Sequence, residues 1–174
     1  MIQTENAGDN TSEFKSPIPT MSDIFVHFLF GTKKYESALI CFLNAVLTDT
    51  FQNPIKAVTV KNPFSFQTYM HDKSTVLDIV VEDEQSRAFD IEIQIANHKY
   101  FVERTLYYWA KLYSSQLKKN ESYNQLKPVI SIILTDFQVF QEIDLLHSSF
   151  SVRSNDEQRY LLTDHFEMHF LRVP

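Results

Sequence analysis

A run of five aliphatic residues and one serine, Val129-Ile130-Ser131-Ile132-Ile133-Leu134, is the feature that most restricts the fold. Pro128 directly precedes it. A β-rich segment that is apolar at nearly every position is typical of a strand buried on both faces of a sheet. The run therefore predicts a central strand that is covered by other elements on both sides.

Apolar residues before residue 48 recur every three or four positions, and those after residue 55 tend to alternate. The first spacing predicts two helices, over Asp23 to Phe30 and over residues 34–48, and the second predicts strands. The predicted later elements are strands at residues 55–61, 66–70, 74–82 and 88–96, a helix at 98–119 capped by Asn97, and outer strands at 145–153 and 160–172. This order is typical of an α/β or an α+β domain with a mixed sheet, and we expect the α/β class, with a central mixed β-sheet flanked by helices.

The chain of 174 residues has room for one domain with a single core. Residues 1–20 are polar, contain Pro17 and Pro19 and show neither period, so we expect a disordered N-terminal extension and a domain over residues 21–174. No apolar run reaches the roughly 20 residues that span a bilayer, and the N-terminus resembles no secretion signal. We therefore expect a cytoplasmic protein that is not embedded in a membrane.

The cysteine count and the net charge restrict the classes of site that the chain can hold. Cys41 is the only cysteine and lies in an apolar run, which excludes a disulfide framework and a thiolate metal cluster and predicts a buried structural thiol. The formal charge of −6 argues mildly against nucleic-acid binding, because phosphate is bound mostly by Lys and Arg. Basic side chains nevertheless gather between residues 99 and 127, so a local basic face and an ordinary solvated helix surface both stay open.

Two neighbouring predicted strands carry polar side chains that suggest chemistry. In the alternating segment from Phe89 to Ile95, one face consists of Asp90, Glu92 and Gln94. Asp78 interrupts the preceding strand, which is otherwise apolar on both faces. A metal-binding pair of carboxylates and the wet face of an ordinary hairpin both explain this pattern.

A hairpin centred near Gln85 would bring the carboxylates together. It places Val80 opposite Asp90 and Asp78 opposite Glu92, with facing side chains roughly 5 Å apart. Two such carboxylates repel unless a proton or a cation lies between them, and their oxygen atoms suit Mg²⁺ or Mn²⁺. In phosphodiester hydrolysis that ion would acidify a water molecule and neutralise the developing charge.

Three motifs carry a resemblance to a known family. They are Asp72-Lys73-Ser74-Thr75-Val76-Leu77-Asp78-Ile79, Asp90-Ile91-Glu92-Ile93-Gln94 and Arg104-Thr105-Leu106-Tyr107-Tyr108-Trp109-Ala110. In their order and spacing, the chain resembles the PD-(D/E)XK nuclease superfamily and, more narrowly, the recombination-promoting nuclease and transposase family often called Rpn. The resemblance covers most of residues 22–136 and, more weakly, residues 164–171. It implies a restriction-endonuclease-like core.

The resemblance also implies a metal centre on the two strands. Asp78 and Glu92 would be carboxylate ligands of Mg²⁺ or Mn²⁺, and the main-chain carbonyl group of Ile93 would be a further ligand. Gln94 takes the position of the superfamily's usual lysine. Its amide can orient water or phosphate by hydrogen bonding, but it cannot supply positive charge.

Four further residues are candidates around this centre. Lys73 is a candidate to supply the missing charge, with an ordinary exposed lysine at a strand edge as the alternative. Asp23 is a candidate contributor from the first helix, with a favourable interaction with the helix dipole as the alternative. Arg104 and Lys111 are candidates for phosphate contact.

The implied function is metal-dependent cleavage of DNA by an endonuclease with little sequence specificity, in recombination, mobile elements or defence. RNA as a substrate and assembly as a homodimer stay open. The alternative is a catalytically inactive nuclease-like module that binds DNA or regulates a partner protein by oligomerisation. His27, Ser86 and Asn120 depart from the family pattern, and relatives commonly continue beyond Pro174, which leaves a truncated form open.

Two weaker patterns have competing interpretations. His165, Glu167 and His169 would share one face of a strand, as two histidines and one carboxylate of a metal site do, but a wet strand face is the favoured interpretation. The cluster Tyr107-Tyr108-Trp109 offers rings that stack on bases. Because successive helical positions point in different directions, most of these rings should instead pack against the sheet.

Overall fold

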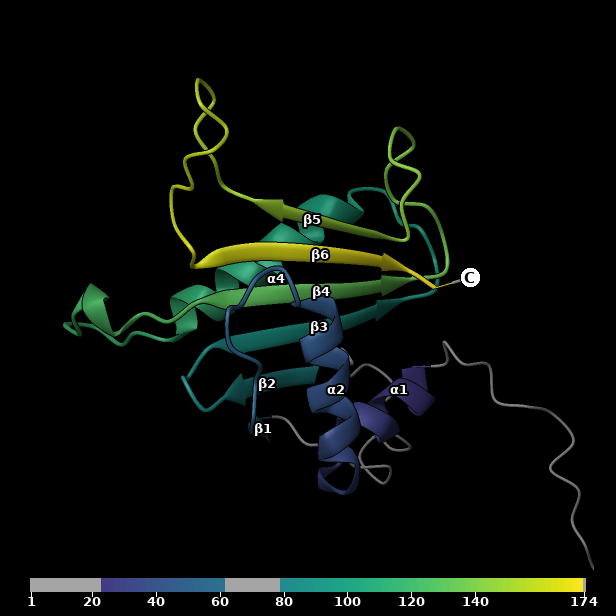
Figure 1. The fold of residues 1–174 in the computed structure, drawn as a ribbon, viewed down its shortest axis with the longest axis horizontal. Coiled ribbons are helices and arrows are strands. Elements are labelled where there is room, and N and C mark those ends of the chain that lie inside the picture. Colours follow the sequence, from purple (N-terminus) through teal and green to yellow (C-terminus); the bar gives the residue numbers. More distant parts are fainter. Residues whose placement is uncertain (1–22, 62–78, 174) are drawn as a thin grey trace, which may run out of the picture.

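The computed structural model of the chain describes residues 23–61 and 79–173, which form a six-stranded sheet in the order β1-β2-β3-β4-β6-β5 (Figure 1). The strands are β1 Val58–Val60, β2 Ile79–Asp83, β3 Ala88–Gln94, β4 Val129–Thr135, β5 His147–Ser151 and β6 Phe166–Arg172. The helices are α1 Asp23–Phe30, α2 Glu36–Val46 and α4 Phe101–Ser115, with short 3-10 turns at Lys33–Tyr35 and Tyr123–Gln125. The predicted N-terminal extension and the predicted strand at residues 66–70 lie outside the described residues.

β4 lies in the interior of the sheet, and all seven of its residues are buried. Its neighbours β3 and β6 run parallel to it, whereas the pairs β1–β2, β2–β3 and β5–β6 are antiparallel. The prediction of a strand buried on both faces within a mixed sheet is therefore confirmed.

Helices cover both faces of the sheet, as a fully buried β4 requires (Figure 1). On one face, Ile130 and Ile132 of β4 belong to a core cluster with Leu43 of α2. On the other face, Ile133 packs with Phe101 of α4. Because successive side chains of a strand point to opposite faces, each residue of β3 and β4 belongs either to the α2 face or to the α4 face.

α4 packs on the start of β4 through Trp109, the single tryptophan of the chain. Its indole N–H group donates a hydrogen bond of 2.8 Å to the carbonyl oxygen of Val129. The ring stacks on Tyr113 and meets the ring of Phe166 edge-on. Trp109 therefore packs against the sheet as predicted, whereas Tyr107 of the same cluster is exposed.

Two predictions about the helices are wrong, and the strand predicted at residues 160–172 begins only at Phe166. α4 does not extend over residues 98–119 with Asn97 as its cap, because the left-handed backbone of Tyr100, with φ of 64° and ψ of 32°, cannot be part of a right-handed helix. Cys41 is exposed rather than buried. The buried stripe of α2 consists of Leu39, Leu43 and Val46, and a residue two positions from this stripe points away from it.

The hairpin of β2 and β3 has the predicted register. Val80 pairs with Asp90, and the predicted pairing of Asp78 with Glu92 lies outside the described residues. Ser86, which stands where the resemblance leads us to expect glycine, has φ of 62°. Glycine adopts this left-handed region without steric cost, which explains the preference at this turn.

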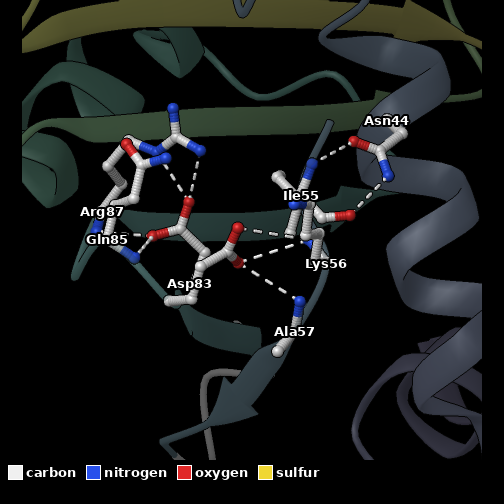
Figure 2. Close-up of polar contacts among 8 residues, drawn as sticks. Asn44, Ile55, Lys56, Ala57, Asp83, Gln85 and Arg87 are labelled. Carbon is white, nitrogen blue, oxygen red and sulfur yellow. Dashed lines mark hydrogen bonds and ion pairs between the residues drawn. The ribbon is translucent and has the colours of Figure 1, made fainter. Parts of the chain in front are cut away.

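A buried ion pair between Asp83 and Arg87 holds the turn of this hairpin (Figure 2). Asp83 Oδ2 accepts a hydrogen bond of 2.6 Å from Arg87 Nε. Asp83 Oδ1 accepts from the main-chain N–H groups of Gln85 and Arg87, each at 2.9 Å. The Asp83 side chain is 0% exposed and that of Arg87 is 10% exposed. One carboxylate thus accepts hydrogen bonds from the main chain of the turn and forms an ion pair with a buried guanidinium group.

Side-chain hydrogen bonds hold the segment before β1 in place. The side-chain amide nitrogen of Asn44 donates to the carbonyl oxygen of Ile55 at 2.9 Å, and Asn44 Oδ1 accepts from the N–H group of Ile55 at 2.7 Å (Figure 2). The Glu84 carboxylate accepts from the N–H groups of Lys56 and Ala57. Hydrogen bonds from its own main-chain N–H group, and then from these two, lower the pKa of Glu84.

Asp83→Ala should lower the free energy of unfolding by about 3 to 5 kcal/mol, because it leaves the Arg87 guanidinium buried without its counter-ion. Urea denaturation followed by tryptophan fluorescence would measure this loss. Glu82→Ala is the matched control, since it removes the neighbouring and more exposed pair with Lys61, and it should cost no more than about 1 kcal/mol. Equal losses for the two variants would contradict the assignment.

Candidate active site

Alternation along β3 places Asp90, Glu92 and Gln94 on the face that α4 covers. Ile91 belongs to the core on the α2 face, and its neighbours in the strand point the other way. Asp90 and Glu92 are each 6% exposed, whereas Gln94, the last residue of β3, is half-buried. A group of polar side chains therefore lies between the sheet and α4.

Arg104 of α4 reaches this polar group. Its Nη2 lies 2.6 Å from Glu92 Oε1 and also donates a short hydrogen bond to Gln94 Oε1. The amide nitrogen of Gln94 donates to the carbonyl oxygen of Ala96 at 3.0 Å. The side chain of Glu92 is 9% exposed and that of Arg104 is 36% exposed. Two oxygen atoms from alternate residues of β3 thus converge on one cationic nitrogen atom.

The packing of the first turn of α4 sets the position of Arg104. Phe101 is buried against Ile133 of β4, and its ring centre lies 5.6 Å from the guanidinium carbon of Arg104. Thr105 is buried, and its hydroxyl group donates to the carbonyl oxygen of Val102 at 2.8 Å. Buried residues on both sides of Arg104 therefore fix this turn of the helix against the sheet.

Ser131 of β4 is a polar residue of this face that the sequence analysis did not single out. It is the register partner of Asp90, it is 2% exposed, and its Oγ has no hydrogen-bond partner among the described residues. Its place as the one polar residue within the aliphatic run of β4 is the signal that could have identified it. Ser131 adds a neutral hydroxyl group beneath α4.

The oxygen atoms at this place suit a hard divalent cation. Mg²⁺ and Mn²⁺ prefer carboxylate and amide oxygens. Glu92 and Gln94 already share one cationic nitrogen of Arg104, which marks a position where positive charge is stabilised. Among the described residues, Glu92 and Gln94 therefore supply part of the ligand set of a divalent ion, and no group of three His, Cys, Asp or Glu side chains completes it. An ion bound there would compete with Arg104 for Glu92 Oε1.

A cavity of about 530 Å³ lies away from this group, at the other end of the parallel strands. Its lining includes Arg87, Lys127 and Glu167, which lie just before or at the start of β3, β4 and β6. Glu92 and Gln94 lie near the end of β3, so the cavity is separate from the candidate active site.

The sequence model of the family described as "PD-(D/E)XK nuclease family transposase" matches residues 20–174. The chain belongs to this family. No curated protein and no solved structure matches the chain. The PD-(D/E)XK family implies a nuclease-type function with nucleic acid as the substrate and, in general, a divalent metal ion. No helix within the described residues is long and apolar enough to cross a membrane.

The structure brings together part of the site that the PD-(D/E)XK resemblance implies. Glu92 and Gln94 meet at Arg104. Lys111 follows Arg104 by two helical turns and is exposed, so both cations lie along one side of α4. Asp78, Lys73 and the side chain of Asp23 lie outside the described residues. The metal-binding, catalytic and phosphate-binding roles of all the predicted site residues stay predictions.

His165, Glu167 and His169 do not come together as a metal site, and the described residues contain no cluster of three ligating side chains that could hold an ion. His165 Nδ1 shares a hydrogen bond of 2.9 Å with the Tyr113 hydroxyl group. Glu167 Oε1 lies 3.3 Å from His169 Nε2, and His169 Nδ1 lies 2.8 Å from His147 Nε2. His169 is 2% exposed, so the favoured interpretation of a wet strand face is wrong at this position.

His147 should make the stability of the fold depend on pH. Burial, and then the neighbouring His169, lower the pKa of His147 below its usual value of 6.5. The unfolded chain then binds a proton at His147 more readily than the folded chain does. The contribution of neutral His147 to the free energy of unfolding is therefore complete above pH 6.5 and is lost as the pH falls through the lowered pKa. Urea denaturation above and below pH 6.5 would measure it, and His147→Gln should show a weaker dependence. An identical pH dependence in both proteins would count against this account.

Proposed function

We propose that this chain is a metal-dependent endonuclease that hydrolyses phosphodiester bonds of DNA with little sequence specificity. The observation that carries the proposal is the convergence of Glu92 Oε1 and Gln94 Oε1 on Arg104 Nη2. All three residues lie in motifs through which the sequence resembles the PD-(D/E)XK nucleases. Stabilising the charge of a transferring phosphoryl group is the task that a carboxylate-held cation and a guanidinium group perform together.

Glu92 would hold the metal ion together with Asp78 and the carbonyl group of Ile93. A divalent ion, when bound, neutralises the charge that develops on the phosphate and lowers the pKa of the attacking water. The low exposure of Glu92 keeps solvent away from its carboxylate, which strengthens its interaction with a cation. Gln94 would orient the water or a phosphate oxygen through its amide group.

Arg104 would supply the positive charge that Gln94 lacks. Its guanidinium group has several N–H donors in a planar arrangement that suits phosphate as well as carboxylate. Its side chain is about one-third exposed, so its guanidinium group can release the Glu92 carboxylate and bind a phosphate instead without a movement of α4. Lys111, farther along α4, would contact the next part of the backbone. Phosphate contacts carry no base information, which supports cleavage with little sequence specificity.

Arg104→Gln should separate metal binding from cleavage. Removing the competing cation should tighten Mn²⁺ binding by roughly tenfold, or about 1.4 kcal/mol, while the loss of a phosphate contact should slow cleavage by about a hundredfold or more. Isothermal titration and cleavage of supercoiled plasmid DNA measure the two effects. Glu103→Gln, on the adjacent exposed residue, is the control and should change neither. Weaker metal binding by Arg104→Gln would refute the competition between Arg104 and the ion.

Variants of the strand residues should divide into two classes. Asp78→Ala and Glu92→Ala should each abolish Mn²⁺ binding and cleavage, because an ion held by so few carboxylates has none to spare. Gln94→Ala should retain metal binding and slow cleavage by about a hundredfold, as expected for one lost positioning donor. Gln94→Lys, which restores the usual superfamily residue, should stay active or improve. Cleavage at the wild-type rate by both alanine variants of the carboxylates would refute the site.

A catalytically inactive module that binds DNA or a partner protein is the second candidate function. The observation that favours it is the amide of Gln94, which stands in the lysine position and is engaged by Arg104 and by the carbonyl oxygen of Ala96. Metal titration distinguishes the two candidates. Metal affinity that is lost in Glu92→Ala supports the enzyme, whereas DNA binding with no metal dependence and no cleavage supports the module.

A further inference from the structure

β5 forms one edge of the sheet, and half of its main-chain groups point outward. Arg172 N donates to Leu146 O at 2.8 Å, and the antiparallel ladder with β6 continues from there residue by residue. Hydrogen-bonded and non-hydrogen-bonded positions alternate in such a ladder. The N–H and C=O groups that point away from the sheet are therefore those of His147, Ser149 and Ser151.

β5 lacks three of the features that protect edge strands from association, namely charged side chains, proline and bulges. The eight residues from Leu145 to Val152 include no charged side chain and no proline, and the pairing with β6 has no bulge. At the other edge of the described sheet, β1 has three residues and is flanked by Lys56 and Lys61. β5 is therefore the less protected of the two edges of the described sheet.

Exposed apolar side chains gather next to this edge. Half of the exposed large hydrophobic residues in the described part of the chain come from residues 145–162, namely Leu145, Leu146, Val152, Tyr160, Leu161 and Leu162. The loops that precede and follow β5 both extend past the strand on the side away from β6 (Figure 1). A concentration of exposed apolar residues of this kind marks an interaction site.

We infer that β5 pairs antiparallel with β5 of a second copy of this chain, about a two-fold axis that is normal to the sheet and passes through Ser149. The pairing joins two sheets into one continuous sheet. It involves residues far from Glu92 in the strand order and does not depend on the proposed function.

The outward-pointing groups determine this register. A two-fold axis normal to the sheet places the same face of both sheets on the same side. Hydrogen bonds between the two strands then form only where residues with outward-pointing main-chain groups lie opposite one another. With the axis at Ser149, this residue faces its own counterpart, and His147 of each copy faces Ser151 of the other. Each of these three pairs exchanges two main-chain hydrogen bonds. Moving the axis by one residue leaves an outward-pointing residue without a partner in β5.

The ends of the uncharged run complement each other in the antiparallel arrangement. Asp144, which pairs with Arg172 of its own chain at 3.0 Å, precedes the run, and Arg153 follows it. Each end of the pair therefore brings Arg153 of one copy next to the Asp144 carboxylate of the other. Parallel pairing would instead bring like charges together at both ends. Leu146 of each copy would face Val152 of the other, which buries two of the exposed apolar side chains on each side. β5 of a second copy is thus complementary to this edge in both its end charges and its apolar side chains.

A cysteine pair tests the register directly. In a Cys41→Ser background, Ser149→Cys should form an intermolecular disulfide on mild oxidation, because Cα atoms that face each other in a hydrogen-bonded pair are about 5.5 Å apart. Ser148→Cys is the matched control. Its counterpart lies diagonally across the pair at roughly 7 to 8 Å, which is too far for a disulfide. Equal cross-linking of the two variants, or none of Ser149→Cys, would overturn the register.

The oligomeric state tests the interface itself. By light scattering, the wild type should have about twice the chain mass of 20.4 kDa. Ser149→Pro should raise the dissociation constant by about a hundredfold, because it removes two main-chain hydrogen bonds at the axis. Proline is tolerated where the N–H group of an edge strand faces solvent, so the variant should fold, and Ser149→Ala should remain dimeric. A monomeric wild type, or a Ser149→Pro dimer of unchanged affinity, would overturn the inference and leave β5 to a strand of another protein or to solvent.

Discussion

The arrangement of the chain depends on one constraint, which is that β4 has no face that can be exposed to water. A strand of this kind must lie inside a sheet and between two layers of helix. α2 and α4 therefore occupy opposite faces, and β3, which lies parallel to β4, has one row of side chains in each layer. The apolar row of β3 joins the core on the α2 face, and the polar row lies under α4. The candidate active site is thus a consequence of the burial of its neighbouring strand.

Arg104 pairs with the buried carboxylate of Glu92 from within the protein. A carboxylate as little exposed as that of Glu92 is costly unless a cation or several hydrogen bonds compensate for the lost water. Arg104 provides that compensation from the opposite layer, so the polar row of β3 and the docking of α4 support each other. An ion that bound Glu92, as proposed, would replace one cation by another without leaving a bare buried charge. Its binding would then be linked to the position of the guanidinium group.

Local patterns predicted much of this fold, and long-range contacts limited the rest. The hairpin register with Val80 opposite Asp90 followed from alternation around a short turn, and the run of β4 predicted its burial. The later start of α4 depends on the left-handed backbone at Tyr100, a conformation that residue type does not indicate. The pairing of Arg104 with Glu92 joins a helix to a strand and depends on the rotation of α4 about its axis. The motif identified Arg104 as a candidate, but neither spacing nor composition indicates that its partner is a carboxylate of the same site.

The position of Trp109 gives the chain a built-in optical probe. It is the only tryptophan, its indole N–H group is bonded to Val129 at the first residue of β4, and it lies on the same helix as Arg104. Any tilt or slide of α4 that moves the guanidinium group relative to β3 also changes the polarity around this indole ring. The wavelength of tryptophan emission from the unlabelled protein therefore reports the position of α4 relative to the sheet, in real time and in the presence of DNA.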